Sequence, residues 1–361
     1  MISKIHLQGF KSFENVDVEL TGINVLIGAN GSGKSNFLAF FNFLLAVNRE
    51  GLGFEVAKAG GVNRFLHYGR QVTEQLTWDI SFGDKRDKYC AELTPSNEEY
   101  FIFKYETVES QTSHWVLGRG HRESKVRLDS SHSSQTSQQI AAYLDGIATY
   151  HFHDTSVNSP LNQPSSSSLK HTRLRQHGEN IAGFLRTLKE NSPKRYKLLL
   201  KTVNSVAPYF LEFRWQEIGQ EKISLTWLSR YSDEEFRFTD FSDGTQRFVA
   251  LCCVFLQEDL PDTIVIDEPE LGLHPTAIAK LVGLMRSAVG RGAQVIAATQ
   301  STDFVDYFKA NEIIAADQTQ GVTHLKRLDG QALSIWLEDY SLGDLWSQGI
   351  LNRAQVSNPN D

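Results

Sequence analysis

The chain has 361 residues, of which 40% are apolar and 22% are charged. At roughly 150 residues per domain, this length predicts two domains or one large interrupted domain, with enough apolar surface to exclude a disordered chain or a small disulfide scaffold. Asp and Glu outnumber Lys and Arg by 43 to 36, and the net charge of −7 excludes a uniformly basic, nucleic-acid-coating surface.

The first third of the chain is predicted to be rich in strands. Its predicted strands have apolar residues that alternate with polar ones or form a short run, and they cover residues 5–7, 16–20, 23–27, 76–82, 89–93, 100–105 and 114–117. The apolar segment 37–47 is long enough for a buried helix. We therefore expect strands on both sides of one early helix.

Polar segments interrupt the middle of the chain. Residues 129–139 are polar and low in complexity, and residues 156–178 are rich in Ser, Pro and Asn, which is typical of a mobile loop. Between them, residues 140–150 predict a helix followed by a strand. After them, apolar residues spaced at i, i+3, i+4 and i+7 predict a helix over 181–188, and a second predicted helix over 196–206 ends before a proline.

The last third of the chain begins with two predicted strands and then alternates helices with strands. In chain order, these elements cover residues 210–215, 223–228, 248–256, 263–266, 277–289 and 294–298. Alternation of this kind predicts a parallel sheet covered by helices. The sequence has no internal repeat and no sustained heptad pattern, so we expect no long coiled coil.

The cysteine count and the apolar runs indicate in which cellular compartment the protein is expected. The three cysteines are an odd number, and Cys252 and Cys253 lie in the apolar run 248–257, which predicts buried thiols in a reducing environment. That run is too short to span a bilayer, and the N-terminal residues 1–10 lack the long apolar segment of a signal peptide. We therefore expect a cytoplasmic protein without a membrane segment.

A motif with phosphate-binding chemistry lies between the predicted strand 23–27 and the predicted helix 37–47. Its residues are Gly28, Ala29, Asn30, Gly31, Ser32, Gly33, Lys34 and Ser35, which fit the pattern G-x-x-x-x-G-K-[ST]. Glycines let the backbone wrap closely around an anion, with several N–H groups pointing inward. We expect Lys34 to pair with the β- and γ-phosphates and Ser35 to hold Mg²⁺, and we include the next residue, Asn36, in the nucleotide-binding set.

A pair of carboxylates follows the apolar strand predicted at 263–266. In an open α/β sheet, ligands bind at the carboxyl ends of the strands, where Asp267 and Glu268 are expected to lie. Asp267 is predicted to orient the Mg²⁺ shell, and Glu268 is predicted to accept a proton from the attacking water. Glu270 is either a solvated turn residue or a supporting residue of this site.

Four segments of the sequence resemble one family. They are GFKSF at 9–13, GANGSGKS at 28–35, FSDGTQRF at 241–248 and VIDEPELGLHP at 265–275. Together they resemble the ABC-type ATPase heads of the SMC, RecF and RecN group, and in particular the compact bacterial AAA family ATPases of that group, which lack long coiled coils. YHFHDTS at 150–156 and the stretch 174–188 also resemble that subgroup.

The resemblance implies an α/β fold of the P-loop NTPase class. The expected architecture is an ABC-type ATPase head with a mixed sheet, an antiparallel β subdomain and a helical insertion. We expect the N-terminal part of the head over residues 1–155, a mobile loop and helical insertion over 156–204, and the C-terminal part of the head over 205–361. The implied ligands are ATP and Mg²⁺.

The resemblance also implies that two subunits complete each nucleotide site. Ser242, Asp243 and Gly244 stand where the family's signature motif closes over the γ-phosphate held by the other subunit. A Ser hydroxyl at a helix N-terminus is suited to bind such an anion, and the same residue also suits a simple N-cap. Residues 271–275 occupy the position of the loop that contacts the opposite subunit. The implied assembly is an ATP-dependent homodimer or a higher assembly of such dimers.

The sequence departs from the family at the switch position. Residues 299–301 read Thr-Gln-Ser where these ATPases usually carry His. Gln300 can donate an amide hydrogen bond to the γ-phosphate, but it cannot change charge near neutral pH. By their order in the chain, Gln71 and Gln75 are the alternatives for the family's Q-loop residue. Lys11 and Ser12 of GFKSF either lie near the nucleotide or form an ordinary strand turn.

Two other enzyme classes are less compatible with the sequence. Ser242 lies 208 residues after Lys34, a longer gap than in transporter ATPases, and no apolar surface helix suits docking to membrane partners. OLD-family proteins carry a TOPRIM nuclease domain after a similar head. Only 60 residues follow Ser301, near the lower limit of about 50 for a domain, and they contain no D-x-D pair. We therefore expect any nuclease activity to belong to a separate effector subunit.

Two functions fit the motifs. The first is an ATP-gated switch or motor on DNA, in genome maintenance or antiphage defence, and the second is an ATP-driven switch that binds only protein.

Two basic runs are either phosphate-binding surfaces or ordinary solvated segments. The first run contains Lys170, His171, Arg173, Arg175 and His177, and the second contains Arg119, Arg122, Lys125 and Arg127. His151 and His153 alternate with Phe152 in a predicted strand, but no Cys or acidic residue lies at zinc-ligand spacing, so no zinc site is expected.

Overall fold

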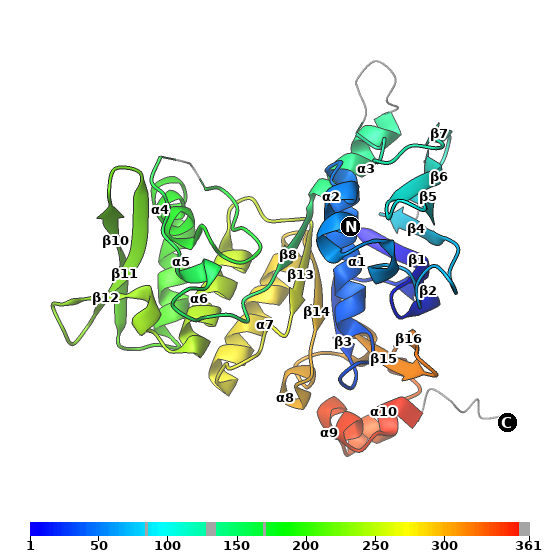
Figure 1. Ribbon diagram of the computed structural model, residues 1–361. Helices are drawn as coiled ribbons and strands as arrows, with labels where there is room; N and C mark the ends of the chain where they lie inside the picture. The colour runs from blue at the N-terminus through cyan, green and yellow to red at the C-terminus, as the bar shows by residue number, and fades with distance from the viewer. Residues whose placement is uncertain (84–85, 128–134, 169–170, 354–361) are drawn as a thin grey trace. The chain divides into compact units, whose positions relative to one another are not determined.

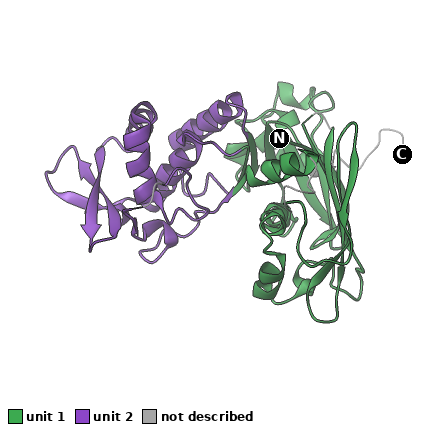
Figure 2. Cartoon of the chain, turned by 90° about the horizontal axis from the view of Figure 1, so that it is seen from above, with its two compact units in different colours: residues 1–148, 262–265, 294–361 green, residues 149–261, 266–293 purple. Residues whose placement is uncertain are grey.

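The computed structural model describes residues 1–83, 86–127, 135–168 and 171–353. The chain forms two compact units, shown in Figure 2. Unit 1 contains residues 1–148, 262–265 and 294 onward, and unit 2 contains residues 149–261 and 266–293. This division differs from the predicted one, because the helical segment predicted as an insertion over 156–204 belongs to the same unit as residues 205–261 and 266–293.

Most residues of a six-stranded mixed sheet belong to unit 1. Its strands, in spatial order, are β16 (Val322–Arg327), β15 (Ile313–Thr319), β3 (Ile23–Ile27), β14 (Gln294–Ala298), β13 (Thr263–Asp267) and β8 (Ile147–Tyr150). β3 pairs in parallel with both β14 and β15, while β16 is antiparallel to β15. The prediction that the strands at 23–27, 263–266 and 294–298 share one sheet is confirmed.

The second sheet of unit 1 is antiparallel throughout. Its strands, in spatial order, are β2 (Phe13–Glu19), β1 (Ile2–Phe10), β4 (Leu76–Phe82), β5 (Asp87–Pro95), β6 (Phe101–Glu109) and β7 (His114–Gly118). Alternate residues of β1 and β2 are buried, as expected for a sheet with one face on the core. The predicted antiparallel β subdomain is confirmed.

Helix α1 (Lys34–Asn48) lies between these two sheets and forms the core of unit 1 (Figure 1). Phe40 and Phe43 are fully buried, with ring centroids 6.4 Å and 5.8 Å from the Trp78 ring of β4. On its other side, α1 contacts β14. Because α1 starts directly after the phosphate-binding motif, this packing fixes the position of that motif against both sheets.

The described residues of unit 1 form five further α-helices. They are α2 (Leu52–Ala59), α3 (Gln135–Asp145), α8 (Thr302–Val305), α9 (Leu342–Ser347) and α10 (Ile350–Arg353). Gln294, at the start of β14, is buried and donates hydrogen bonds to the carbonyl oxygens of Ile2 (2.8 Å) and Thr21 (2.9 Å). This side chain joins the start of β14 to the first residues of the chain.

In the described part of unit 2, a small antiparallel sheet is combined with four α-helices. Its strands are β10 (Phe210–Ile218), β11 (Lys222–Ser229), β12 (Glu235–Arg237) and the short β9 (Ser165–Ser166), which pairs with β11. Its helices are α4 (Ile181–Asn191), α5 (Pro193–Asn204), α6 (Asp243–Leu256) and α7 (Pro275–Gly290). The predicted apolar face of α4 is buried, and α5 packs between α4 and α6.

Several predictions about local structure need correction. Residues 135–139, predicted as part of a polar loop, begin α3, and the rest of that loop, 129–134, lies outside the described residues. The described parts of the segment predicted as a mobile loop over 156–178 are anchored, because β9 pairs with β11 and Leu161 and Leu174 are buried. The strand predicted around His151 and His153 ends earlier, since β8 stops at Tyr150.

Two predictions about composition can be compared with the structure. Cys252 and Cys253 are free and fully buried on α6, as predicted. Within the part of the chain that the structure describes, no helix combines the length and the apolar character required to cross a membrane.

Candidate nucleotide-binding site

The phosphate-binding motif forms the turn between β3 and α1 in unit 1. Lys34 is the first residue of α1, and its side chain folds back over this turn. The Lys34 Nζ atom donates hydrogen bonds to the carbonyl oxygens of Gly28 (2.7 Å) and Ala29 (3.0 Å), and only 6% of the residue is exposed. A buried ammonium group needs such acceptors, and here they hold the positive charge inside the turn.

Gly33 is required by the close approach of a neighbouring strand. It caps α1 with a φ of +101°, and a Cβ atom at this position would collide with the Thr323 side chain of β16. Thr323 Oγ1 lies 3.1 Å from the carbonyl oxygen of Ser32 and 2.8 Å from Ser12 Oγ. Asn36 Nδ2 also donates to Ser12 Oγ, over 2.8 Å. Hydrogen bonds of Thr323 and Ser12 therefore stabilise the turn and the start of α1 that follows it.

These contacts change the interpretation of the segment GFKSF. Lys11 and Ser12 form the turn between β1 and β2, so the interpretation as a strand turn is confirmed, and Ser12 at the same time contacts Asn36, the residue that follows the phosphate-binding motif, and Thr323. Lys11 has a φ of +49°, and burial lowers the pKa of its ammonium group. Thr323 was missed by the sequence reasoning, because it lies 290 residues after Gly33 and belongs to no motif.

The motif fits a phosphate group and an oxygen-binding cation. Ser32 Oγ is buried, and within the described part of the chain it has no hydrogen-bond partner. A buried hydroxyl without a partner favours an anion in the turn, because an unsatisfied polar group has a free-energy cost. Ser35 is exposed, and its hydroxyl is an oxygen ligand of the kind that Mg²⁺ prefers. The residues of this turn therefore fit a phosphate group and offer one oxygen ligand to Mg²⁺.

Gln300 lies at the same sheet edge as this motif. β3 and β14 are parallel, so their carboxyl ends meet at one edge, and the Thr299 N–H donates to the Leu26 carbonyl oxygen over 3.0 Å. Ser301 begins α8 as its N-cap, accepting a hydrogen bond from Phe304 N. The Gln300 side chain between them is exposed, as its predicted role at a γ-phosphate requires.

The predicted acidic residues lie at the carboxyl end of β13. Asp267 is the last residue of the strand, and Glu268 follows it in unit 2 with a φ of +44°. A left-handed conformation costs a non-glycine residue on the order of 1–3 kcal/mol, and such residues cluster at functional sites. Glu270, two residues further on, is buried rather than solvated. The structure thus favours a supporting role for Glu270 over a plain surface turn.

The predicted signature residues lie at the N-terminus of α6 in unit 2. Ser242 is the N-cap, and its Oγ accepts a hydrogen bond from Thr245 N over 3.3 Å. A Cβ atom on Gly244 would collide with the carbonyl oxygen of Gly272, in the loop before α7. Asp243 Oδ1 accepts a hydrogen bond from Thr155 Oγ1 over 2.9 Å. The N-cap interpretation is confirmed, and the close contact with Gly272 joins the signature segment to the predicted subunit-contact loop.

Arg247 connects three segments of unit 2. Its guanidinium donates to the carbonyl oxygens of Phe152 (3.1 Å), His153 (2.8 Å) and Leu271 (3.4 Å). The segment 150–156 is therefore held against α6 and against the loop that follows β13. Sequence reasoning missed this residue, although it belongs to the FSDGTQRF segment that carries the resemblance.

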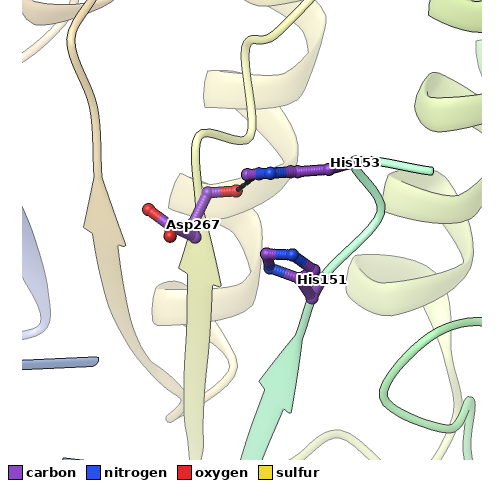
Figure 3. A group of neighbouring side chains, drawn as sticks. All are labelled: His151, His153 and Asp267. Atoms are coloured by element: carbon purple, nitrogen blue, oxygen red, sulfur yellow. Dashed lines mark hydrogen bonds between the residues drawn. The ribbon is translucent and has the colours of Figure 1, made fainter. Parts of the chain in front are cut away.

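Two histidines of the same segment lie beside Asp267 (Figure 3). One ring nitrogen of His151, one ring nitrogen of His153 and a carboxylate oxygen of Asp267 all lie within 4.8 Å of one another. His153 Nε2 lies 3.3 Å from the backbone carbonyl oxygen of Asp267, and the two imidazole rings are 4.1 Å apart. Partial desolvation and the neighbouring His153 lower the pKa of His151. The expectation that no acidic group accompanies this pair was wrong, because Asp267 lies more than 100 residues away in sequence.

Several residues of the two basic runs are engaged in contacts within the chain. In the first, His171 is buried, and Arg173 forms two hydrogen bonds with the Asp259 carboxylate (2.7 Å and 3.1 Å); Lys170 lies outside the described residues. In the second, Arg127 pairs with Asp145, and the Arg122 guanidinium stacks 3.8 Å from the Tyr100 ring. These contacts favour the interpretation as ordinary structural segments.

Taken together, the fold and the two sets of motifs define a P-loop ATPase of the ABC/SMC type. The AAA_21 family, described as "AAA domain, putative AbiEii toxin, Type IV TA system", matches residues 23–306. This chain belongs to that family.

Curated relatives match about a third of the chain. The chain is 28% identical over 137 residues to the energy-coupling factor transporter ATP-binding protein EcfA2 of Lactobacillus delbrueckii subsp. bulgaricus, covering 37% of this chain and 46% of that protein. It is also 28% identical over 123 residues to the chromosome partition protein Smc of Methanococcus voltae, covering 31% of this chain and 10% of that protein. The chain thus spans less than half the length of these relatives.

Two solved structures share the fold over nearly the whole chain. One is an Smc head bound to the C-terminal winged-helix domain of ScpA, with a TM-score of 0.61 and 16% identity, covering 92% of this chain and 99% of that chain. The other is an Smc head with an extended coiled coil bound to the C-terminal domain of ScpA from Pyrococcus furiosus, with a TM-score of 0.55 and 16% identity, covering 94% and 98%. The predicted ABC-type head fold is confirmed.

Arg247→Ala is expected to loosen the segment 150–156. The substitution removes a charged donor from three carbonyl oxygens, and hydrogen bonds to charged groups contribute about 1.5–3 kcal/mol each. Hydrogen–deuterium exchange should show faster exchange in 150–156 and 271–274. Arg214→Ala, which removes a half-exposed ion pair with Glu212 on β10, is the matched control. Unchanged exchange in 150–156 would show that Arg247 does not hold this segment.

Proposed function

We propose that this chain is a Mg²⁺-dependent ATPase in which binding of ATP drives the association of two heads. The buried Lys34 ammonium inside the phosphate turn is the observation that carries this proposal. Its positive charge lies beside a buried Ser32 hydroxyl without a partner among the described residues, so the turn offers both a cation and a donor to a phosphate group.

In the proposed reaction, each residue of the nucleotide site has one role. Lys34 exchanges its backbone acceptors for the β- and γ-phosphate oxygens, while the N–H groups of residues 28–33 surround the same anion. Ser35 and Asp267 hold the Mg²⁺, which neutralises charge on the phosphates when it is bound. Glu268 accepts a proton from the attacking water, and its left-handed backbone sets the direction of its carboxylate. Gln300 donates an amide hydrogen bond to the γ-phosphate.

The signature residues support a site shared between two subunits. Ser242 and Asp243 begin α6, whose N-terminus carries a partial positive charge suited to an anion. In the proposed dimer, the Ser242–Gly244 segment of one head covers the γ-phosphate bound at Lys34 of the other. Two heads related by a two-fold axis close two sites at once. The stability of the dimer therefore depends on how much more tightly ATP binds the closed dimer than the separate heads.

We propose further that the head dimer acts as a switch or motor on DNA, together with a separate nuclease or effector subunit. The likeness to Smc heads over nearly the whole chain supports an SMC-type role more than a transporter role, since the transporter relatives match about a third of the chain. Both of those Smc heads have a domain of ScpA bound, which supports a protein partner on this head also.

An ATP-driven switch that binds only protein is the second candidate. It is favoured by the basic runs, in which Arg173 and Arg127 are ion-paired and Arg122 is stacked on a tyrosine ring, and by the net charge of −7. Binding to duplex DNA separates the two functions. A role on DNA predicts ATP-dependent binding that weakens steeply as salt rises, because protein cations displace counterions from the phosphates. Absence of such binding at low salt, measured by fluorescence anisotropy with ATP and Glu268→Gln protein, would favour the protein switch.

The chemistry is tested with two substitutions at the proposed site. Lys34→Ala should abolish ATP binding measured by calorimetry, because the charge that clamps the phosphates is lost. Glu268→Gln should preserve binding but slow hydrolysis by about 10²–10⁴-fold, the range for a lost general base. Lys58→Ala, an exposed lysine of α2, is the control. Unaltered turnover in Glu268→Gln would exclude Glu268 as the base and direct attention to Glu270.

The assembly is tested with Ser242→Arg. In a Glu268→Gln background, ATP should produce a dimer or a higher assembly of dimers by sedimentation analysis, and Ser242→Arg should block it without preventing nucleotide binding at Lys34. Ser341→Arg makes the same change at the N-cap of α9 and should leave assembly unaffected. Mixing Lys34→Ala with Ser242→Arg protein should restore one competent site per mixed dimer. If diluted single heads hydrolyse ATP at the undiluted rate, the shared site is wrong.

A further inference from the structure

The pair of histidines beside Asp267 has a ligand chemistry that ATP hydrolysis does not require. Mg²⁺ prefers oxygen ligands, whereas imidazole nitrogens suit Zn²⁺ and the other later first-row cations. Two imidazoles and one carboxylate are a recurrent protein donor set for zinc, with a water in the fourth position. His151, His153 and Asp267 offer this set within one unit of the chain (Figure 3).

The backbone that carries the histidines is held on several sides. Arg247 donates to the carbonyl oxygens of Phe152 and His153, and the His151 N–H donates to the carbonyl oxygen of Gln176 over 3.0 Å. Asp267 is fixed as the last residue of β13. Ligands on a fixed backbone lose little conformational freedom when they bind a metal, and this pre-organisation favours affinity.

The side chains themselves can reach a common ion. Zinc–nitrogen distances of about 2.0–2.1 Å place tetrahedral ligands about 3.4 Å apart, so the three atoms, which lie within 4.8 Å of one another, have to approach by at most about 1.4 Å. His151 is exposed and has room to rotate, and its exposure also gives the ion and its water a path of entry. In the tautomer in which His153 Nε2–H donates to the Asp267 carbonyl oxygen, the Nδ1 lone pair remains for a metal.

From this geometry we infer that His151, His153 and Asp267 form a binding site for one divalent transition-metal cation of the Zn²⁺ class. The site shares Asp267 with the proposed Mg²⁺ site. In this respect the inference rests on the proposed function: a cation held by the histidines occupies the Asp267 carboxylate, and ATP hydrolysis is then inhibited.

Metal binding is tested on the full chain without nucleotide or Mg²⁺, with Co²⁺ as a spectroscopic probe and Zn²⁺ as its competitor. We expect one Co²⁺ per chain with the intense visible absorption of a four-coordinate site, displaced by one equivalent of Zn²⁺. Loss of a hydrogen-bond partner behind a metal ligand already costs about 10–100-fold in affinity, so His151→Ala should weaken binding at least 10-fold. His153→Gln should also weaken Co²⁺ binding at least 10-fold. The amide of the introduced glutamine can still donate to the Asp267 carbonyl oxygen, which preserves the fold.

The control is His324→Ala, which removes an exposed histidine of β16 and should leave Co²⁺ affinity unchanged. Absence of the absorption band, or a band that persists in a folded protein carrying both His151→Ala and His153→Gln, would overturn the metal site.

Inhibition is tested separately by adding one equivalent of Zn²⁺ to the Mg·ATP assay. We expect inhibition of the unsubstituted chain and its relief in His151→Ala. If Co²⁺ binds as expected but Zn²⁺ leaves hydrolysis unchanged, the metal site stands and the shared role of Asp267 is wrong. If the chain hydrolyses no ATP, the proposed function fails, while the Co²⁺ titration still decides on the metal site.

Discussion

The parallel pairing of β3 with β14 and β15 is the constraint on which the nucleotide site depends. Parallel strands end at a common edge, so the turn that follows β3 and the residues that follow β14 are brought together although they lie some 270 residues apart in sequence. Packing of α1 between two sheets then fixes the start of that helix, where Lys34 is buried. The phosphate-binding chemistry is thus a consequence of how the core of unit 1 is built.

A comparable constraint acts in unit 2 through the segment 150–156. Arg247 holds its backbone, Thr155 hydrogen-bonds to Asp243 of the signature segment, and His153 approaches the carbonyl oxygen of Asp267. One short segment therefore contacts both the residues proposed to meet a second subunit and the strand end proposed to hold Mg²⁺. These hydrogen bonds offer a route by which we expect assembly to be coupled to hydrolysis.

The sequence predicted those parts of the fold and site that depend on local patterns. Apolar alternation and short apolar runs located β1 to β7, and the fixed spacing of the motif located the turn before Lys34, because glycine, lysine and hydroxyl positions are dictated by short-range geometry. Thr323, Arg247 and the partnership of Asp267 with two histidines were not predicted, since each depends on contacts between segments far apart in sequence. The segment 156–178 was expected to be mobile because its composition is polar, but β9 and its buried apolar residues anchor it.

The central claim is that Lys34 and the Ser242–Gly244 segment act on one γ-phosphate from two different chains. The most direct measurement is a crystal structure of the Glu268→Gln protein with ATP and Mg²⁺. The account predicts a γ-phosphate with Lys34 Nζ of one protomer and Ser242 Oγ of its partner at hydrogen-bonding distance, about 2.7–3.2 Å from phosphate oxygens. A γ-phosphate contacted by Lys34 and Ser242 of the same chain, or by no second chain, would contradict it.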